Sequence, residues 1–200
     1  IPSFTLHHFR LPVVPCATRF WQSGSSLVHL PFGTYSKNKK QLRRHKMYST
    51  LLVFHSLIRW LVLVFILYSI YRAFVGLVND RAFSKTDNAF RHWTATVAHI
   101  QLLIGIILYT KSPLVKYFWK EKESGFQNLE LTFYGLIHII LMLTAIVVVT
   151  IGSAKAKRQQ TNKKKFKTML VWFSIALFII FIAIPWPFSP FSGRPYFRIF

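Results

Sequence analysis

The sequence contains few acidic residues and a single cysteine. Only 5 of its 200 residues are Asp or Glu, against 26 Lys and Arg, and the net charge is +21. Cys16 alone excludes an intramolecular disulfide, a C-x-x-C-H haem attachment motif, and cysteine-ligated zinc or iron–sulfur centres. H-E-x-x-H, Walker and nucleophile-elbow motifs are also absent, so nothing in the sequence indicates a hydrolytic enzyme.

Charged residues make up 16% of the chain, below the quarter or so that is typical of soluble domains, whereas 52% of the residues are hydrophobic. Four apolar stretches lie at about residues 51–71, 93–109, 131–151 and 169–184. A helix of about 20 apolar residues spans the hydrocarbon core of a bilayer. We therefore predict an all-α fold, a four-transmembrane-helix bundle with up-down-up-down topology, whose partner is the lipid bilayer.

The basic residues lie in short runs between the apolar stretches, where membrane proteins carry cytoplasmic positive charge, so nucleic acid is not an expected partner. Side A denotes the side with Met47, the loop 110–130 and the C-terminal tail. Side B denotes the side with the loops 72–91 and 152–168. Side B carries more Lys and Arg than side A when residues 1–46 are left out. The positive-inside rule then places both termini outside if the chain starts at Met47.

Residues 1–46 form a separate block with Lys and Arg, no Asp or Glu, and no sustained apolar periodicity. Three interpretations stay open: translated sequence upstream of a start at Met47, a transit peptide, or a disordered basic arm on anionic lipid. The block would add cations to side A and leave the orientation undecided. The predicted organisation is a basic low-structure leader at 1–46, a four-helix transmembrane domain at 47–190 and a tail at 191–200.

Ionisable side chains inside the spans are the candidates for function, because such groups are costly in hydrocarbon. They are His55 and Arg59 on the first span, His99 on the second and His138 on the third. At 1.5 Å per residue, we place them between about 6 and 15 Å deep from side A, in one half of the bilayer.

Two imidazoles on facing helices can bind haem iron from opposite sides when their depths match. The matched pairs are His55 with His138 and His99 with His138; the second pair lies deeper in the hydrocarbon and is preferred. The four expected spans contain no Asp or Glu, so Arg59 is expected to contact backbone carbonyls, lipid phosphate or an anion such as a haem propionate. Each of these residues also has a plain structural interpretation, as an interhelical donor or an interfacial anchor.

Other polar and small residues accompany this group. Tyr134 and Met142 lie on the same stripe of the third span as His138, and Gly105 and Gly135 leave room for a flat macrocycle or a close helix. Gln101 faces away from His99 and is expected to link two helices.

The segments HSLIRW at 55–60, AFSKTD at 82–87, AHIQLLIGIILY at 98–109 and IPWPF at 184–188 resemble a family of small bacterial four-helix membrane proteins labelled cytochrome b-like. The resemblance covers about residues 47–190. It implies haem b, electron transfer and the cytoplasmic membrane of a bacterium. The family pattern has an acidic residue just before the third-span histidine, where this sequence has Ile137.

The sequence thus predicts a membrane electron-transfer protein that binds haem b through His138 with His99 or His55, and that contacts quinone or other redox membrane proteins. It would be an electron carrier or membrane subunit rather than a stand-alone catalyst. The alternatives are a cofactor-free structural or assembly subunit of a membrane complex, and a small transporter with a histidine proton relay.

Overall fold

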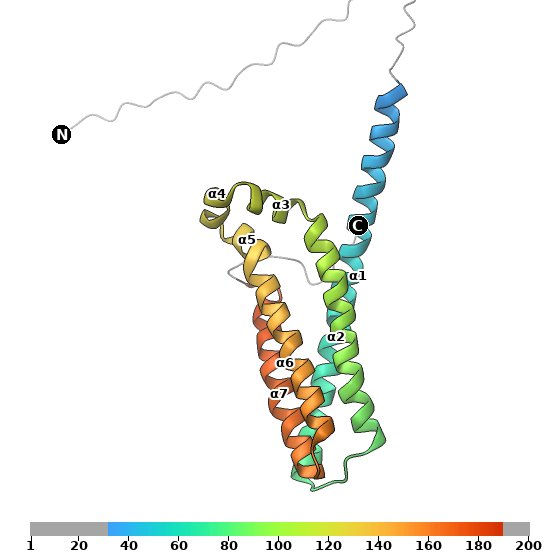
Figure 1. The fold of residues 1–200 in the computed structure, drawn as a ribbon, viewed down its shortest axis with the longest axis vertical. Helices are drawn as coiled ribbons and strands as arrows, with labels where there is room; N and C mark the ends of the chain where they lie inside the picture. Colours follow the sequence, from blue (N-terminus) through green and yellow to red (C-terminus); the bar gives the residue numbers. More distant parts are fainter. Residues whose placement is uncertain (1–31, 190–200) are drawn as a thin grey trace, which may run out of the picture.

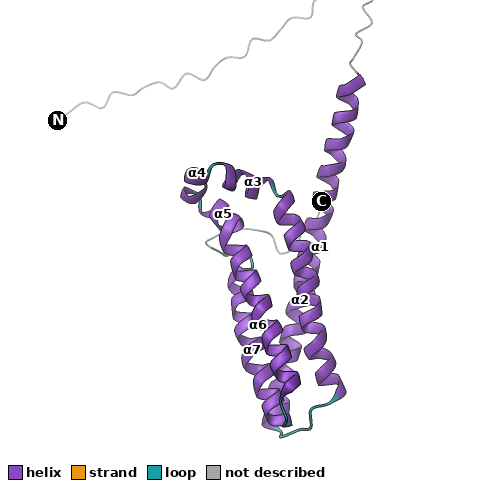
Figure 2. Ribbon diagram, in the orientation of Figure 1, coloured by secondary structure: helices purple, strands orange, loops and turns teal. Residues whose placement is uncertain are grey.

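A computed structural model describes residues 32–189 of the chain, and this part is helical without strands (Figure 2). The elements are α1 (Phe32–Val78), α2 (Lys85–Lys111), α3 (Pro113–Lys120), α4 (Lys122–Gln127), α5 (Leu129–Thr132), η1 (Phe133–Ile137), α6 (His138–Arg158) and α7 (Asn162–Ala183). Among them, four helices are long and apolar enough to cross a membrane: Gln41–Val78, Lys85–Lys111, Leu129–Arg158 and Asn162–Ala183. The predicted all-α fold with four spans is confirmed.

The long helices form an antiparallel bundle in which α1 packs against α2 and α7, and α6 packs against α7 and α2 (Figure 1). The short helices α3 and α4 cross the side A end of the bundle, α5 leads through η1 into α6, and the connections 79–84 and 159–161 close the side B end (Figure 1). This arrangement leaves the middle of the bundle enclosed by four helices, with a cap of short helices on side A.

Helix α1 begins well before the predicted first span. It includes residues 32–46, which the sequence analysis expected to have little structure. Lys, Arg, Gln and Leu dominate the end of this segment, and all four are good helix formers. No proline or glycine follows Gly33 until Gly76, so the helix that starts in this segment continues into the membrane span. Residues 1–31 and the predicted tail at 191–200 lie outside the described residues.

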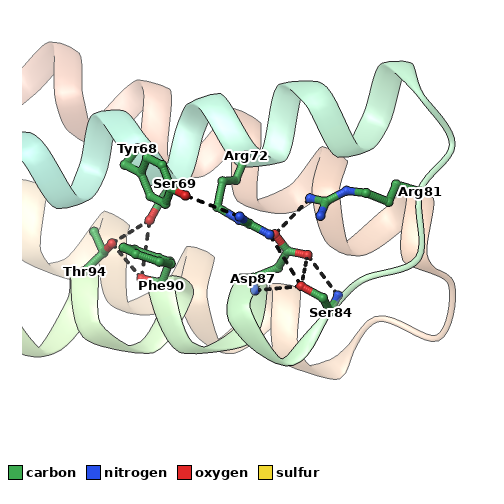
Figure 3. A network of polar contacts seen from close by, with 8 residues as sticks. All are labelled: Tyr68, Ser69, Arg72, Arg81, Ser84, Asp87, Phe90 and Thr94. Atoms are coloured by element: carbon green, nitrogen blue, oxygen red, sulfur yellow. Dashed lines mark hydrogen bonds and ion pairs between the residues drawn. The ribbon is translucent and has the colours of Figure 1, made fainter.

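Helix α2 starts at a capping box, ahead of the apolar stretch expected at about residues 93–109. Ser84 is the N-cap: its hydroxyl accepts a hydrogen bond from the Asp87 backbone N–H, and the Asp87 carboxylate accepts from the Ser84 N–H. Asp87 also forms ion pairs with Arg72 (2.6 Å) and Arg81 (3.0 Å), as Figure 3 shows. The fully buried carboxylate therefore joins α1, the connecting loop and α2 at the side B end.

Close packing inside the bundle, from its middle to its side B end, depends on large buried side chains that meet small residues. Phe166, Phe173 and Met169 of α7 are fully buried, and the ring of Phe166 lies against Gly76 of α1. Glycine at such a crossing lets two helix backbones approach closely, which is how helices associate in membranes. The outer faces carry exposed apolar residues such as Leu103 and Phe178, as expected where lipid is the solvent.

Candidate functional site

A largely apolar cavity of about 190 Å³ lies inside the side A half of the bundle. Its walls come from α1, α2, α3, η1, α6 and the C-terminal end of α7. Its deep end is lined by Val62, Ala98, Ala145 and Ile146. The end near side A is lined by His55, Arg59, Gln101, Tyr134 and His138, together with Tyr48, Tyr109 and Ser112. The structure therefore brings two of the three predicted histidines and the predicted arginine to one cavity.

His138 is held in one tautomer by a backbone carbonyl. Its Nδ1 lies 2.8 Å from the carbonyl oxygen of Ala183, at the end of α7. A carbonyl can only accept, so Nδ1 carries the hydrogen, and the Nε2 lone pair of the neutral ring is left for another partner. Histidines that ligate metals are commonly oriented in this way by a carbonyl bonded to the second ring nitrogen.

The carbonyl of Ala183 is available because of the sequence after α7. In an α-helix it would accept from the backbone N–H four residues later, but that residue is Pro187, which has none. Pro185 leaves the carbonyl of Phe181 open in the same way, and Trp186 Nε1 donates to it at 2.9 Å. The sequence analysis missed these contacts, although the spacing of the two prolines contains the signal.

His55 faces the cavity from α1, beside Gly105 of α2. A Cβ atom at Gly105 would lie 3.3 Å from Cε1 of the imidazole, so the glycine provides the space that the ring occupies. The buried Nδ1 atom of His55 has no hydrogen-bond partner among the described residues. Gln101 Nε2 donates to the backbone carbonyl of His55 at 2.8 Å, which confirms the predicted role of Gln101 as a link between helices.

Arg59 lies one helical turn deeper than His55 on the same face of α1. Its Nη2 donates to the hydroxyl of Ser56 at 3.3 Å, and its guanidinium lies 5.6 Å from the ring centre of Trp60. Across the cavity lie Tyr134 on η1 and His138 at the start of α6. Arg59 therefore places a positive charge at the wall of a cavity that two imidazoles also line.

The structure does not bring His99 to His138. The side chain of His99 is exposed on the outer surface of the bundle, and its Nε2 lies 3.4 Å from Thr150 Oγ1. Thr150 is twelve residues beyond His138 on the same helix, about 18 Å along its axis. The preferred pair of the sequence analysis is thus separated by depth and by helix face. The other matched pair, His55 with His138, lies in the cavity.

The residues just before His138 form a π-helical turn, in which the His138 N–H donates to the carbonyl of Phe133. Such turns are frequent at functional sites because they change which side chains share a face. The Tyr109 hydroxyl donates to the carbonyl of Gly135 at 2.7 Å, and Trp119 Nε1 donates to the same hydroxyl oxygen at 2.8 Å. Two hydrogen bonds thus connect α3, α2 and the turn that carries the site.

Gly135 leaves room for a neighbouring helix rather than for a flat macrocycle. The buried ring of Phe118, on α3, lies directly against it. The glycine therefore allows the cap helix α3 to close the side A end of the bundle, whereas Gly105 lines the cavity itself.

Within residues 32–189, no group of three or more His, Cys, Asp or Glu side chains is placed to hold a metal ion. Haem needs at most two protein ligands, and two imidazoles face the cavity. Comparisons with protein families, with curated proteins and with solved structures find no match to this chain.

Proposed function

We propose that this integral membrane protein binds haem b between His55 and His138 and acts as an electron carrier. The observation that carries the proposal is the arrangement of His138: Nδ1 donates to the Ala183 carbonyl, and the Nε2 lone pair is left for a ligand in the cavity. The second imidazole, that of His55, lines the same cavity from a different helix, so the two side chains would hold the haem iron between α1 and α6.

The donor set fits haem in kind. His55 has a buried ring nitrogen without a hydrogen-bond partner in the described part of the chain. Arg59, on the same face of α1, supplies a cation for a propionate. The cavity volume of about 190 Å³ is below the roughly 300–1,000 Å³ of pockets for drug-sized ligands, so binding requires the surrounding helices to separate.

When bound, haem b supplies one-electron oxidation and reduction of iron. The chain would contribute the two imidazoles that hold the haem, it orients one of them through the Ala183 carbonyl, and its largely apolar walls would exclude water from the site. Burial and the positive charge of Arg59 both affect the reduction potential of such a site. Membrane quinones or other redox membrane proteins are the proposed partners, and a bacterial cytoplasmic membrane is the proposed location, with side B inside if Met47 is the first residue.

The test is a reduced-minus-oxidised visible spectrum of the full chain, expressed with added haem and purified in mild detergent. We expect a b-type α band that disappears in His55→Ala and in His138→Ala. His92→Ala is the matched control, because it removes an exposed histidine near side B, and it should keep the band. His99→Ala should keep it as well.

Loss of the band in His99→Ala but not in His55→Ala would assign the ligands to the other pair and overturn this site. A folded, monodisperse and colourless wild-type protein would overturn haem binding altogether. A second candidate function is that of a cofactor-free structural subunit of a membrane complex, which the small volume of the cavity favours. For a colourless protein, copurification with partner proteins would identify that complex.

A further inference from the structure

His99 lies in the middle of the second membrane span and faces outward. Fourteen residues of α2 precede it and twelve follow it, and its imidazole is exposed at the boundary between α2 and α6. A polar side chain at this depth faces hydrocarbon rather than water, which is costly and marks a functional position. The surface around it therefore calls for a polar partner within the membrane.

The hydrogen bonds of His99 show whether such a partner has to donate or to accept a hydrogen bond. Nδ1 lies 2.7 Å from the carbonyl oxygen of Ala95 and therefore carries the ring hydrogen. Nε2 of the neutral ring is then an acceptor. Thr150 Oγ1 lies 3.4 Å from it, but this hydroxyl donates to the carbonyl of Ile146 at 2.7 Å. The Nε2 lone pair thus faces the lipid without a strong donor.

A molecule that satisfies this acceptor needs an O–H group that can enter the middle of the bilayer. Phospholipid headgroups stay at the interface, about 15 Å away in a hydrocarbon core of about 30 Å. Aromatic hydroxyls attached to apolar tails can reach the required depth. Exposed apolar side chains next to His99 and Thr150, among them Leu103 and Val147, provide a surface for such a tail.

We propose that His99 and Thr150 form a lipid-facing binding site for a hydroquinone with an apolar tail. One ring hydroxyl donates to His99 Nε2, and the Thr150 oxygen is within reach of the same group. The site adjoins the deep end of the cavity, because Ala98 and Ile146 line the cavity from the same two helices. It stands independently of haem binding, since no atom of the cavity takes part.

The donor requirement gives a test that depends on the oxidation state of the ligand. A quinone carries carbonyl acceptors where the hydroquinone carries hydroxyl donors, so it cannot donate to Nε2. In nanodiscs containing the full chain, a decyl-tailed benzohydroquinone should bind about tenfold more tightly than the matching quinone, the effect of one well-made hydrogen bond.

His99→Phe should weaken hydroquinone binding about tenfold and leave quinone binding unchanged, so that the preference disappears. His92→Phe is the matched control: it removes another exposed histidine of α2, about 10 Å nearer side B, and should keep the preference. If His99→Phe does not fold, the comparison of the two ligand forms on the wild type and on Thr150→Val still tests the site.

Equal binding of the two forms by the wild type, or an unchanged preference in His99→Phe, would overturn the proposal. A His99→Phe variant that changes from dimer to monomer in nanodiscs, with no hydroquinone binding by the wild type, would also overturn it and assign this surface to a second copy of the chain. The haem spectrum of the same samples shows separately whether the proposed function holds.

Discussion

Removing the Asp87 carboxylate should destabilise the bundle more than removing any acid on its surface. Asp87 is fully buried, and it accepts hydrogen bonds from Arg72, Arg81 and both the N–H and the hydroxyl of Ser84. Asp87→Ala leaves two guanidinium groups without their counter-ion and breaks the capping box. Breaking a buried ion pair from one side costs about 3–5 kcal/mol, and losing an N-cap costs about 0.5–2 kcal/mol.

The partial exposure of both arginines reduces the loss of stability that we expect from Asp87→Ala. The side chains of Arg72 and Arg81 are 18% and 37% exposed, so water and lipid headgroups can reach the guanidiniums after the carboxylate is gone. We therefore expect Asp87→Ala to lower the free energy of unfolding by about 3 kcal/mol, the lower end of the range for a buried pair. The measurement is a reversible SDS titration in mixed micelles, followed by circular dichroism.

Glu121→Ala is the matched control, because Glu121 is also an acid in an ion pair with a neighbouring cation. Its partner Lys120 lies 3.5 Å away, and the two side chains are 48% and 80% exposed. Such surface pairs contribute about 0–1 kcal/mol. The reasoning fails if Asp87→Ala and Glu121→Ala shift the unfolding midpoint by the same amount.

Two further substitutions test the packing on which the site depends. Gly76→Ala would normally stabilise a helix by about 0.5–1 kcal/mol, but the added Cβ would overlap the buried ring of Phe166. We therefore expect a net loss of about 1–2 kcal/mol in the free energy of unfolding in the same titration, and we expect Phe166→Leu, added to Gly76→Ala, to restore that loss. Tyr109→Phe removes the hydroxyl between Trp119 and the Gly135 carbonyl and should cost about 1 kcal/mol, whereas no change would show that these hydrogen bonds do not support the π-helical turn.

The sequence by itself determined the four spans, because an apolar stretch of about 20 residues has few alternatives to crossing a bilayer as a helix. It also determined where α7 ends, because Pro185 and Pro187 lack the backbone N–H groups that would continue the helix. Helix α2 begins before the apolar stretch expected at about residues 93–109, because the capping box of Ser84 and Asp87 starts the helix in polar sequence. The spacing of Ser84 and Asp87 is itself a capping-box signal, whereas the contact of Asp87 with Arg72 of α1 is seen only in the tertiary structure.

Only the tertiary structure decided which histidines share the cavity. His99 and Ala98 are adjacent in the sequence, yet Ala98 lines the cavity and His99 faces the lipid. The spans are apolar on every side, so their sequences hardly mark an inward face. That face is set by where small and large side chains fit, as Gly105 does beside His55. The depth of a side chain in the membrane follows from its position along one helix, whereas the direction in which it points is settled by packing between helices.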